Sequence, residues 1–215
     1  YNMTRWAKRV EKAIYRWAAR VVVVSPDMRD FLVSQGRVTA NKVDVISNAG
    51  ALEGIRPLPR QNSFSHKHGL DDRFVVLFAG NMGYSQGMEN IIEAAALLAD
   101  NPRILFLLVG DGVMCNRVEE MILERRLTNV RLLPYQPAEN VPEMYASADV
   151  GLVTLRKGFT QFSEPSKIYS ILASGRPVVA MMDKHSDIAR RIQNSHCGAV
   201  VEPDNPQALG SSLLE

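Results

Sequence analysis

The stretch FVVLFAGNMGYSQGMENIIEAAALLADNPRILFLLVG, residues 74–110, places a glycine-rich turn and a helical segment between two apolar runs. Both runs, Phe74–Ala79 and Ile104–Val109, are apolar without interruption, which is typical of strands buried on both faces of a parallel sheet. Four further apolar runs alternate with helical segments, at residues 130–133, 150–153, 178–181 and 199–201. Six such strands predict an α/β domain with a doubly wound, Rossmann-like parallel sheet.

An N-terminal region with a different pattern precedes this sheet. Apolar residues at helical spacing predict a helix over residues 4–19. Two short strands are expected at residues 21–25 and 42–48. The helix between them should begin after Ser25, which can cap it, and should stop at Gly36.

A segment without periodicity joins the two regions. Residues 49–65 carry two glycines and two prolines, which favours a linker. We therefore expect a fragment of one domain at 1–48, a linker at 49–65 and a second domain at 66–215. Because the chain begins at Tyr1 and its first residues already have a helical pattern, we also expect it to be part of a longer protein.

The composition is that of an ordinary soluble globular protein, with 46% hydrophobic and 22% charged residues. The net charge of +2 gives no argument for nucleic acid binding, although residues 1–20 hold six arginines and lysines against one glutamate. Cys115 and Cys197 form no ligand cluster, so neither a metal site nor a disulfide is indicated, and a reducing cytosol fits. No apolar run reaches the roughly 18 residues of a membrane span.

In a doubly wound sheet, ligands bind beyond the carboxyl ends of the strands. The first predicted strand of the sheet is followed by Gly80, Gly83 and Gly87, which lead into a helix. Glycines let backbone amides approach a ligand, and a helix start offers free N–H groups to an anion. The GxxGxxxG spacing differs from the GxGxxG of dinucleotide-binding enzymes, and a turn that only permits tight packing explains the same glycines.

The next two strands end in less specific loops. Asp111 lies between Gly110 and Gly112, which indicates a turn beside a ligand or a plain Gly-Asp-Gly turn. Tyr135 follows the third strand, where its ring could flank a base or pack against the proline-rich loop.

A polar stretch, residues 154–167, follows the fourth strand. Pro165 and Ser166 are expected to start a helix that ends at Gly175, so that unpaired amides face the carboxyl edge of the sheet. Lys167 would add a full positive charge at a helix end that prefers negative groups. A bound anion such as a diphosphate would resolve this conflict, whereas a solvated lysine on a surface helix is the alternative.

Taken together, these segments resemble the large family 4 group of retaining glycosyltransferases, which have the GT-B fold. The matching pieces keep the family's order and spacing: VVVVSPDM, KVDVISN, FVVLFAGNMGYSQGMENIIEAA, LLVGDG, NVRLLPYQP, YASADVGLV, PSKIYSILASGRPVVA and CGAVVEPDNPQAL. Two of these pieces, GNMGYSQG and PSK, resemble the motifs of one subgroup of the family. Enzymes of that subgroup build bacterial surface polysaccharides and transfer an N-acetylated deoxyamino sugar.

The resemblance implies that residues 66–215 bind a nucleotide-sugar donor, with UDP as the expected nucleotide, and that residues 1–48 are the last elements of the acceptor domain. It implies transfer with retention to a saccharide or lipid-linked acceptor in polysaccharide or O-antigen synthesis, without a metal or other cofactor. We expect a cytoplasmic enzyme. The basic first helix could hold it on the inner face of the membrane, or could pack on the absent part of the acceptor domain.

The chain departs from the family at three positions. Phe162 and Ser170 stand where most relatives carry two glutamates, and Gln86 stands where they carry a lysine. Glu164 and Lys167 are therefore the catalytic candidates, Glu164 toward the sugar and Lys167 toward the phosphates. The donor-binding candidates are Gly80, Asn81, Gly83, Ser85, Gln86, Gly87, Gly110, Asp111, Gly112, Tyr135, Gln136, Pro165, Ser166, Lys167 and Ser170.

Other classes of protein stay open on the sequence. A nucleotide-sugar epimerase or hydrolase on the same scaffold would turn over the donor without an acceptor. A nicotinamide-dependent oxidoreductase would bind NAD and not UDP, and a binding module would catalyse nothing. The four histidines lie in polar or loop contexts that indicate no catalytic role. We expect this stretch alone to be inactive and to bind donor weakly.

Overall fold

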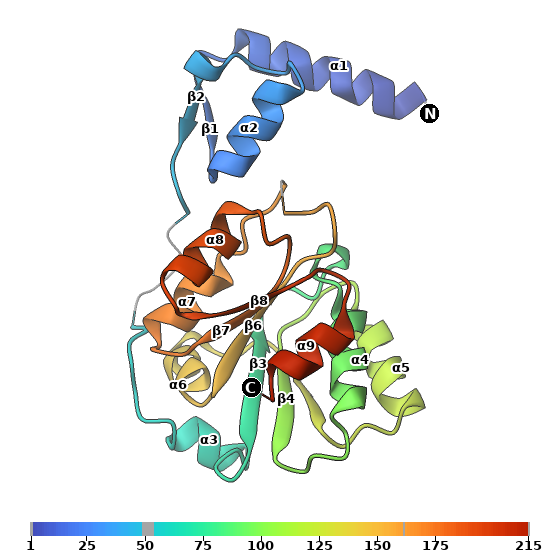
Figure 1. Cartoon of the computed structure of the whole chain (residues 1–215), viewed down its shortest axis with the longest axis vertical. Helices are drawn as coiled ribbons and strands as arrows, with labels where there is room; N and C mark the ends of the chain where they lie inside the picture. The colour runs from blue at the N-terminus through green and yellow to red at the C-terminus, as the bar shows by residue number, and fades with distance from the viewer. Residues whose placement is uncertain (1, 49–53, 161, 215) are drawn as a thin grey trace. The chain divides into compact units, whose positions relative to one another are not determined.

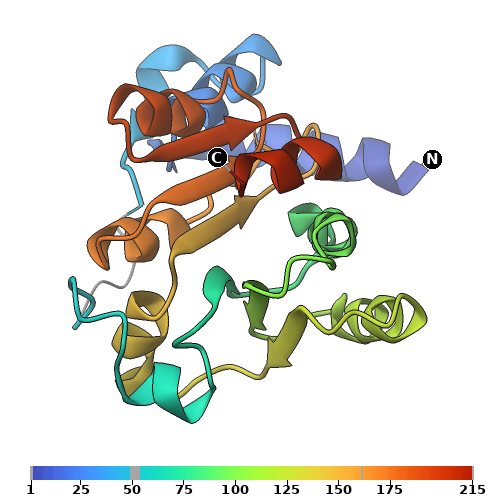
Figure 2. The ribbon, with the colours of Figure 1, turned by 60° about the horizontal axis from the view of Figure 1, so that its bottom comes forward.

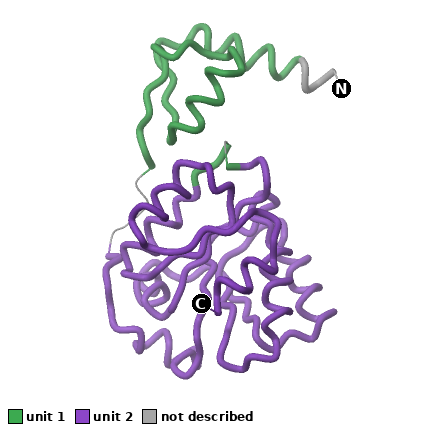
Figure 3. The backbone as a smooth tube through the Cα atoms, in the orientation of Figure 1, with its two compact units in different colours: residues 1–48, 160–164 green, residues 49–159, 165–215 purple. Residues whose placement is uncertain are grey.

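A computed structural model describes residues 2–48, 54–160 and 162–214 of the chain. It divides the chain into two compact units (Figure 3): a first unit of residues 1–48 and 160–164, and a second unit of residues 49–159 and 165–215. The predicted domain boundaries stay a prediction, and residues 49–53 of the predicted linker lie outside the described residues.

The second unit is built on one parallel sheet (Figure 1). Its strands, in the spatial order β5-β4-β3-β6-β7-β8, confirm the doubly wound prediction. From β3 the chain adds β4 and then β5 on one side. It then returns to the centre, where β6 pairs with the other side of β3. The strands are β3 Phe74–Ala79, β4 Ile104–Val109, β5 Val130–Leu133, β6 Val150–Thr154, β7 Val178–Met181 and β8 Gly198–Val201.

Helices cover both faces of this sheet, as Figure 2 shows. One face packs against α3 Ser63–Lys67, α6 Val141–Ala146, α7 Lys167–Ala173 and α8 Asp187–Asn194. The other packs against α4 Met88–Leu97, α5 Cys115–Glu124 and α9 Pro206–Ser212. Side chains alternate between the faces, so that Leu77 of β3 enters the first core and Phe78 the second.

Several predicted element ends differ from the structure. The helix predicted to start at Pro165 begins at Lys167, because Pro165 and Ser166 form a tighter entry turn. In that turn the Ile168 amide donates to the Pro165 carbonyl (3.2 Å) and the Tyr169 amide to the Ser166 carbonyl (3.1 Å). Helix α3 starts inside the predicted linker, where Asn62 and Ser65 form a reciprocal capping box.

The first unit pairs two short parallel strands, β1 Val21–Val23 and β2 Val43–Val45. Its helices are α1 Asn2–Trp17 and α2 Pro26–Ser34. The predicted cap is confirmed, since the Ser25 hydroxyl accepts a hydrogen bond from the Met28 amide at 3.2 Å. Both strands are shorter than predicted. Among the described residues, none of the helices has the length and apolar character that crossing a bilayer would need.

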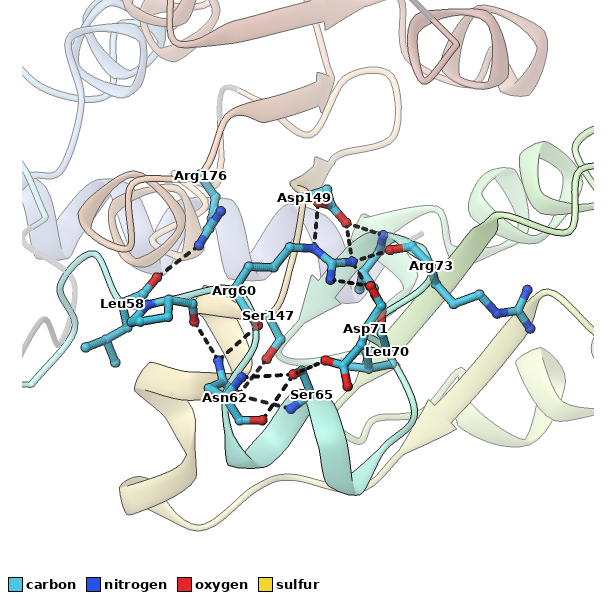
Figure 4. A network of polar contacts seen from close by, with 12 residues as sticks. Leu58, Arg60, Asn62, Ser65, Leu70, Asp71, Arg73, Ser147, Asp149 and Arg176 are labelled. Atoms are coloured by element: carbon cyan, nitrogen blue, oxygen red, sulfur yellow. Dashed lines mark hydrogen bonds and ion pairs between the residues drawn. The ribbon is translucent and has the colours of Figure 1, made fainter.

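A partly buried ion pair ties residues 58–65 to the amino edge of the second unit's sheet (Figure 4). The Arg60 guanidinium contacts both carboxylate oxygens of Asp149, at 2.7 and 2.8 Å, and donates to the Asp71 carbonyl at 3.1 Å. The ion pair raises the pKa of Arg60. Asp149 also accepts the Val75 amide at the start of β3, at 2.7 Å. The segment before the sheet is therefore anchored to strands β3 and β6 together.

We expect Asp149→Ala to lower the free energy of unfolding by about 2–3 kcal/mol, because it leaves a partly buried guanidinium and a backbone amide without their acceptor. Glu93→Ala removes the acidic partner of an exposed ion pair with Arg125 and should cost less than about 1 kcal/mol. Urea unfolding followed by circular dichroism compares the two. Equal losses would contradict the anchoring role of the Arg60–Asp149 pair.

Candidate functional site

The candidate site lies at the carboxyl edge of the sheet, beside the point where the strand order reverses between β3 and β6. The loops after β3 and β6 leave this point in opposite directions along the sheet. Three segments meet here: residues 80–87 after β3, residues 110–114 after β4, and the start of α7 after β6.

The loops after β3 and β4 dock on each other through their backbones. The Met82 amide donates to the Asp111 carbonyl at 2.8 Å, and the Met114 amide donates to the Met82 carbonyl at 3.0 Å. Gly110 has a φ of +145°, and a Cβ added there would overlap the Gly80 carbonyl oxygen. At Gly112 an added Cβ would lie 2.6 Å from the Met82 carbonyl oxygen. Tight packing therefore requires both glycines, whatever else they contact.

The end of the β3 loop is a single 3₁₀ turn, η2 Tyr84–Gln86, which is held on β6. The Thr154 hydroxyl donates to the Gln86 carbonyl at 2.6 Å, and the Arg156 amide donates to the Ser85 carbonyl at 2.9 Å. Gly87, the N-cap residue of α4, then has a left-handed φ of +60°. The Arg156 side chain pairs with Glu89 of α4 at 2.6 Å. These contacts fix the turn against the strand on the other side of the reversal point.

Lys167 joins these elements. Its Nζ lies 3.5 Å from the centroid of the Phe78 ring and donates to Gln86 Oε1 at 3.2 Å. Its Cε and Nζ also border Gly80, at 3.5 and 3.6 Å from where that residue's Cβ would be. The ammonium of α7 thus lies against the end of β3 and the turn that follows it.

The Lys167 side chain is partly exposed, but its ammonium is enclosed, and this burial lowers the pKa of Lys167 to about 7. Burial thus works against the full positive charge expected at this helix start. Near neutral pH the amine is therefore closer to losing its proton than an exposed lysine is.

Other donor-binding candidates lie on the loops after β3, β4 and β5. Asn81 lies between the two glycine loops, with its side chain next to Gly83 and Gly112. Asp111 is exposed, and its carboxylate accepts the Gly112 amide at 2.7 Å, as in a plain turn. Tyr135 is 58% exposed and so is not enclosed by the proline-rich loop. Gln136 donates to the Pro134 carbonyl at 2.8 Å.

The remaining candidates follow β6. Pro165 is buried and Ser166 is exposed, and the Ser166 side chain does not cap α7. Ser170 is 8% exposed and hydrogen-bonds Tyr145, whose pKa is raised chiefly by burial. The structure therefore encloses the Ser170 hydroxyl in the interior instead of bringing it to the loops. Glu164 groups with the first unit.

Two residues beside Lys167 and Gln86 were not among those predicted from the sequence. Phe78 has the pattern of an ordinary core strand residue, and nothing in the sequence shows that its ring faces a lysine. Thr154 is the polar residue that ends the β6 apolar run, which was a usable signal. An open cleft of about 720 Å³ lies at the opposite, amino edge of the sheet, around Arg60, Arg73 and Asp149. Its polar lining belongs largely to the anchoring network of Figure 4.

Comparison with protein families places both parts of the chain among sugar-transferring enzymes. Residues 60–215 match the family described as glycosyl transferases group 1, and residues 1–50 match the family described as glycosyltransferase family 4. The solved structure of Anabaena Alr3699/HepE in complex with UDP and glucose matches 96% of this chain and 56% of its own, with a TM-score of 0.78 and 20% identity. This structural likeness shows the fold.

Two relatives match in sequence. WbjE of Pseudomonas aeruginosa, named as a probable glycosyltransferase, is 32% identical over 98% of this chain and 52% of its own length. WcaI of Escherichia coli strain K12, whose name proposes a glycosyl transferase of colanic acid biosynthesis, is 34% identical over 67% of this chain and 36% of its own length. The chain therefore spans about half the length of WbjE, and less of WcaI.

We expect Gly110→Ala to destabilise the second unit by about 3 kcal/mol or more, since the new Cβ would overlap the Gly80 carbonyl oxygen in a backbone conformation that disfavours side chains. Gly158→Ala is the matched control, because its φ is +82° and nothing lies within 4 Å of the added Cβ. That change should cost about 1–2 kcal/mol. Urea unfolding measures both, and a loss no larger for Gly110→Ala would overturn the account of the docked loops.

Proposed function

The chain belongs to the glycosyl transferases group 1 family, and on this basis we propose that the whole protein transfers a sugar from a nucleotide-sugar donor to a saccharide or lipid-linked acceptor. The observation that carries the proposal is the Lys167 ammonium, held at the strand reversal point next to the glycine loop and Gln86. The family match favours this reading over the epimerase, hydrolase and nicotinamide alternatives.

The proposed chemistry is the departure of a nucleoside diphosphate from the sugar. Negative charge develops on the diphosphate as the glycosidic bond breaks, and preorganised positive groups stabilise it. Most relatives carry a positively charged lysine at the position of Gln86, and here Lys167 would supply that charge instead. The backbone amides at the start of α4 and of the glycine loop would add hydrogen-bond donors. No step in this scheme needs a metal or another cofactor.

We propose UDP as the nucleotide, because the structure of similar fold, HepE, was solved with UDP and glucose. Retention of anomeric configuration and an N-acetylated deoxyamino sugar come from the resemblance to family 4 enzymes. Surface polysaccharide or O-antigen synthesis is the proposed pathway, supported by the name of WcaI. Glu164 is proposed to contact the sugar.

The domain roles follow the family matches. Residues 66–215 are proposed to bind the donor and residues 1–48 to be the last elements of an acceptor domain, with a linker at 49–65. A cytoplasmic location is proposed on the free state of both cysteines.

We also propose a peripheral contact with an anionic membrane through α1. This helix exposes Trp6 and Trp17, at 66% and 86%, together with several arginines and lysines. Aromatic and cationic side chains on one amphipathic helix suit the headgroup region of a bilayer. A lipid-linked acceptor would be reached from that position.

Lys167→Ala should weaken UDP binding to the full-length protein by about 1–3 kcal/mol, the scale of a lost charged hydrogen bond. Lys157→Ala removes an exposed lysine of the same loop region and should leave the affinity unchanged. Isothermal titration calorimetry measures both. Equal affinity for Lys167→Ala and the unaltered protein would refute the donor-site assignment.

Replacing Lys8, Arg9 and Lys12 together by alanine should reduce binding to phosphatidylserine vesicles by roughly 3 kcal/mol, at about 1 kcal/mol for each cation. The matched control replaces three exposed cations of the second unit, Lys67, Arg103 and Lys157. Co-sedimentation of the full-length protein at low salt gives the readout. Unchanged partitioning of the α1 variant would remove the membrane contact.

A further inference from the structure

The Lys167 ammonium has two neighbours whose positions the rest of the fold determines, Phe78 and Gln86. We propose that Phe78 and Gln86 are positioning residues that hold this ammonium where the donor diphosphate binds, and that binding of the diphosphate is accompanied by uptake of a proton on Lys167. This inference rests on the proposed function and adds to it a proton-linked step.

Phe78 provides the first contact. Its ring is 0% exposed at the end of β3, and the face of the ring lies 3.5 Å from Nζ, measured to the centroid. The face of an aromatic ring carries negative electrostatic potential, so it attracts an ammonium without neutralising it. A ring packed inside the core cannot turn away, so it fixes the depth of the ammonium.

Gln86 provides the second contact, and its own position is fixed from two sides. Its carbonyl accepts the Thr154 hydroxyl at 2.6 Å, which holds the backbone on β6. Its Nε2 donates to the Ser85 hydroxyl at 3.3 Å, which turns Oε1 toward Nζ. The amide oxygen is a neutral acceptor, so it directs one N–H of the ammonium and leaves the others for an incoming anion.

Two charged side chains of the adjoining described loops have partners other than Lys167. Arg156 pairs with Glu89, and the Asp111 carboxylate accepts the Gly112 amide. Burial is thus what lowers the pKa of Lys167 to about 7. A diphosphate placed at the ammonium would favour the charged form and raise that pKa. Above pH 7 the amine of the free protein is mainly neutral, so binding to the charged form takes up a proton and weakens as the pH rises.

The experiment measures UDP binding to the full-length protein by calorimetry at pH 7.5 and pH 8.5, where the UDP diphosphate is almost fully ionised. The unaltered protein should lose about eightfold in affinity between these two pH values, from the falling fraction of protonated Lys167. Repeating the titration in two buffers of different ionisation enthalpy should show net proton uptake.

Gln86→Glu is the decisive variant. A carboxylate in place of the amide raises the pKa of Lys167 above the tested range, so the eightfold loss should shrink to less than about twofold. Gln86→Met and Phe78→Leu remove one contact each and should weaken UDP binding at pH 7.5 by about three- to tenfold. Gln193→Glu, on the exposed side of α8, adds the same charge elsewhere and should keep the eightfold loss.

The outcomes separate the two proposals. An unaltered protein that does not bind UDP at either pH defeats the proposed UDP-dependent function. Suppose that Lys167→Ala abolishes UDP binding, but the ratio of affinities at pH 7.5 and pH 8.5 is the same in Gln86→Glu as in the unaltered protein. The proposed function then stands, and the positioning role of Gln86 is overturned. A pH-independent affinity of the unaltered protein overturns the proton uptake. Should Gln86→Glu fail to fold, full affinity in both Gln86→Met and Phe78→Leu overturns the inference as well.

Discussion

The reversal of strand order between β3 and β6 is the constraint on which the candidate site depends. Chain segments leave the two neighbouring strands in opposite directions, so the sheet edge between them is not closed by a single crossover. The turn η2 from one side and the start of α7 from the other meet at this edge. The contact between η2 and α7 places Gln86 next to Lys167, the lysine that the proposed chemistry uses.

Backbone contacts, more than side chains, make the surroundings of Lys167 rigid. The loops after β3 and β4 hydrogen-bond to each other through main-chain groups, which is possible only because Gly110 and Gly112 have no Cβ. The resulting platform fixes Gly80 beside the lysine stem. A glycine-rich sequence that resembles a ligand-binding loop therefore serves packing in the first place.

The placement of the Lys167 ammonium has an electrostatic consequence. An amine enclosed against an aromatic ring and an amide oxygen loses hydration that these neighbours replace only in part, and its pKa falls to about 7. Such a group is poised to gain charge when an anion arrives. If the proposed donor diphosphate binds beside Lys167, the same burial that disfavours the free ammonium makes its charge depend on the ligand.

The sequence by itself determined the six strands, their parallel arrangement and the edge that carries the loops, because continuous apolar runs alternating with helices leave few other folds. It also singled out Lys167, from a cation at a helix start. Only the tertiary structure decided that Phe78 and Gln86 hold the ammonium, that Ser170 faces Tyr145, and that Arg60 pairs with Asp149. These contacts join residues that are distant along the chain. The order of the strands and the docking of the loops determine which residues meet, and local periodicity in the sequence does not encode either of them.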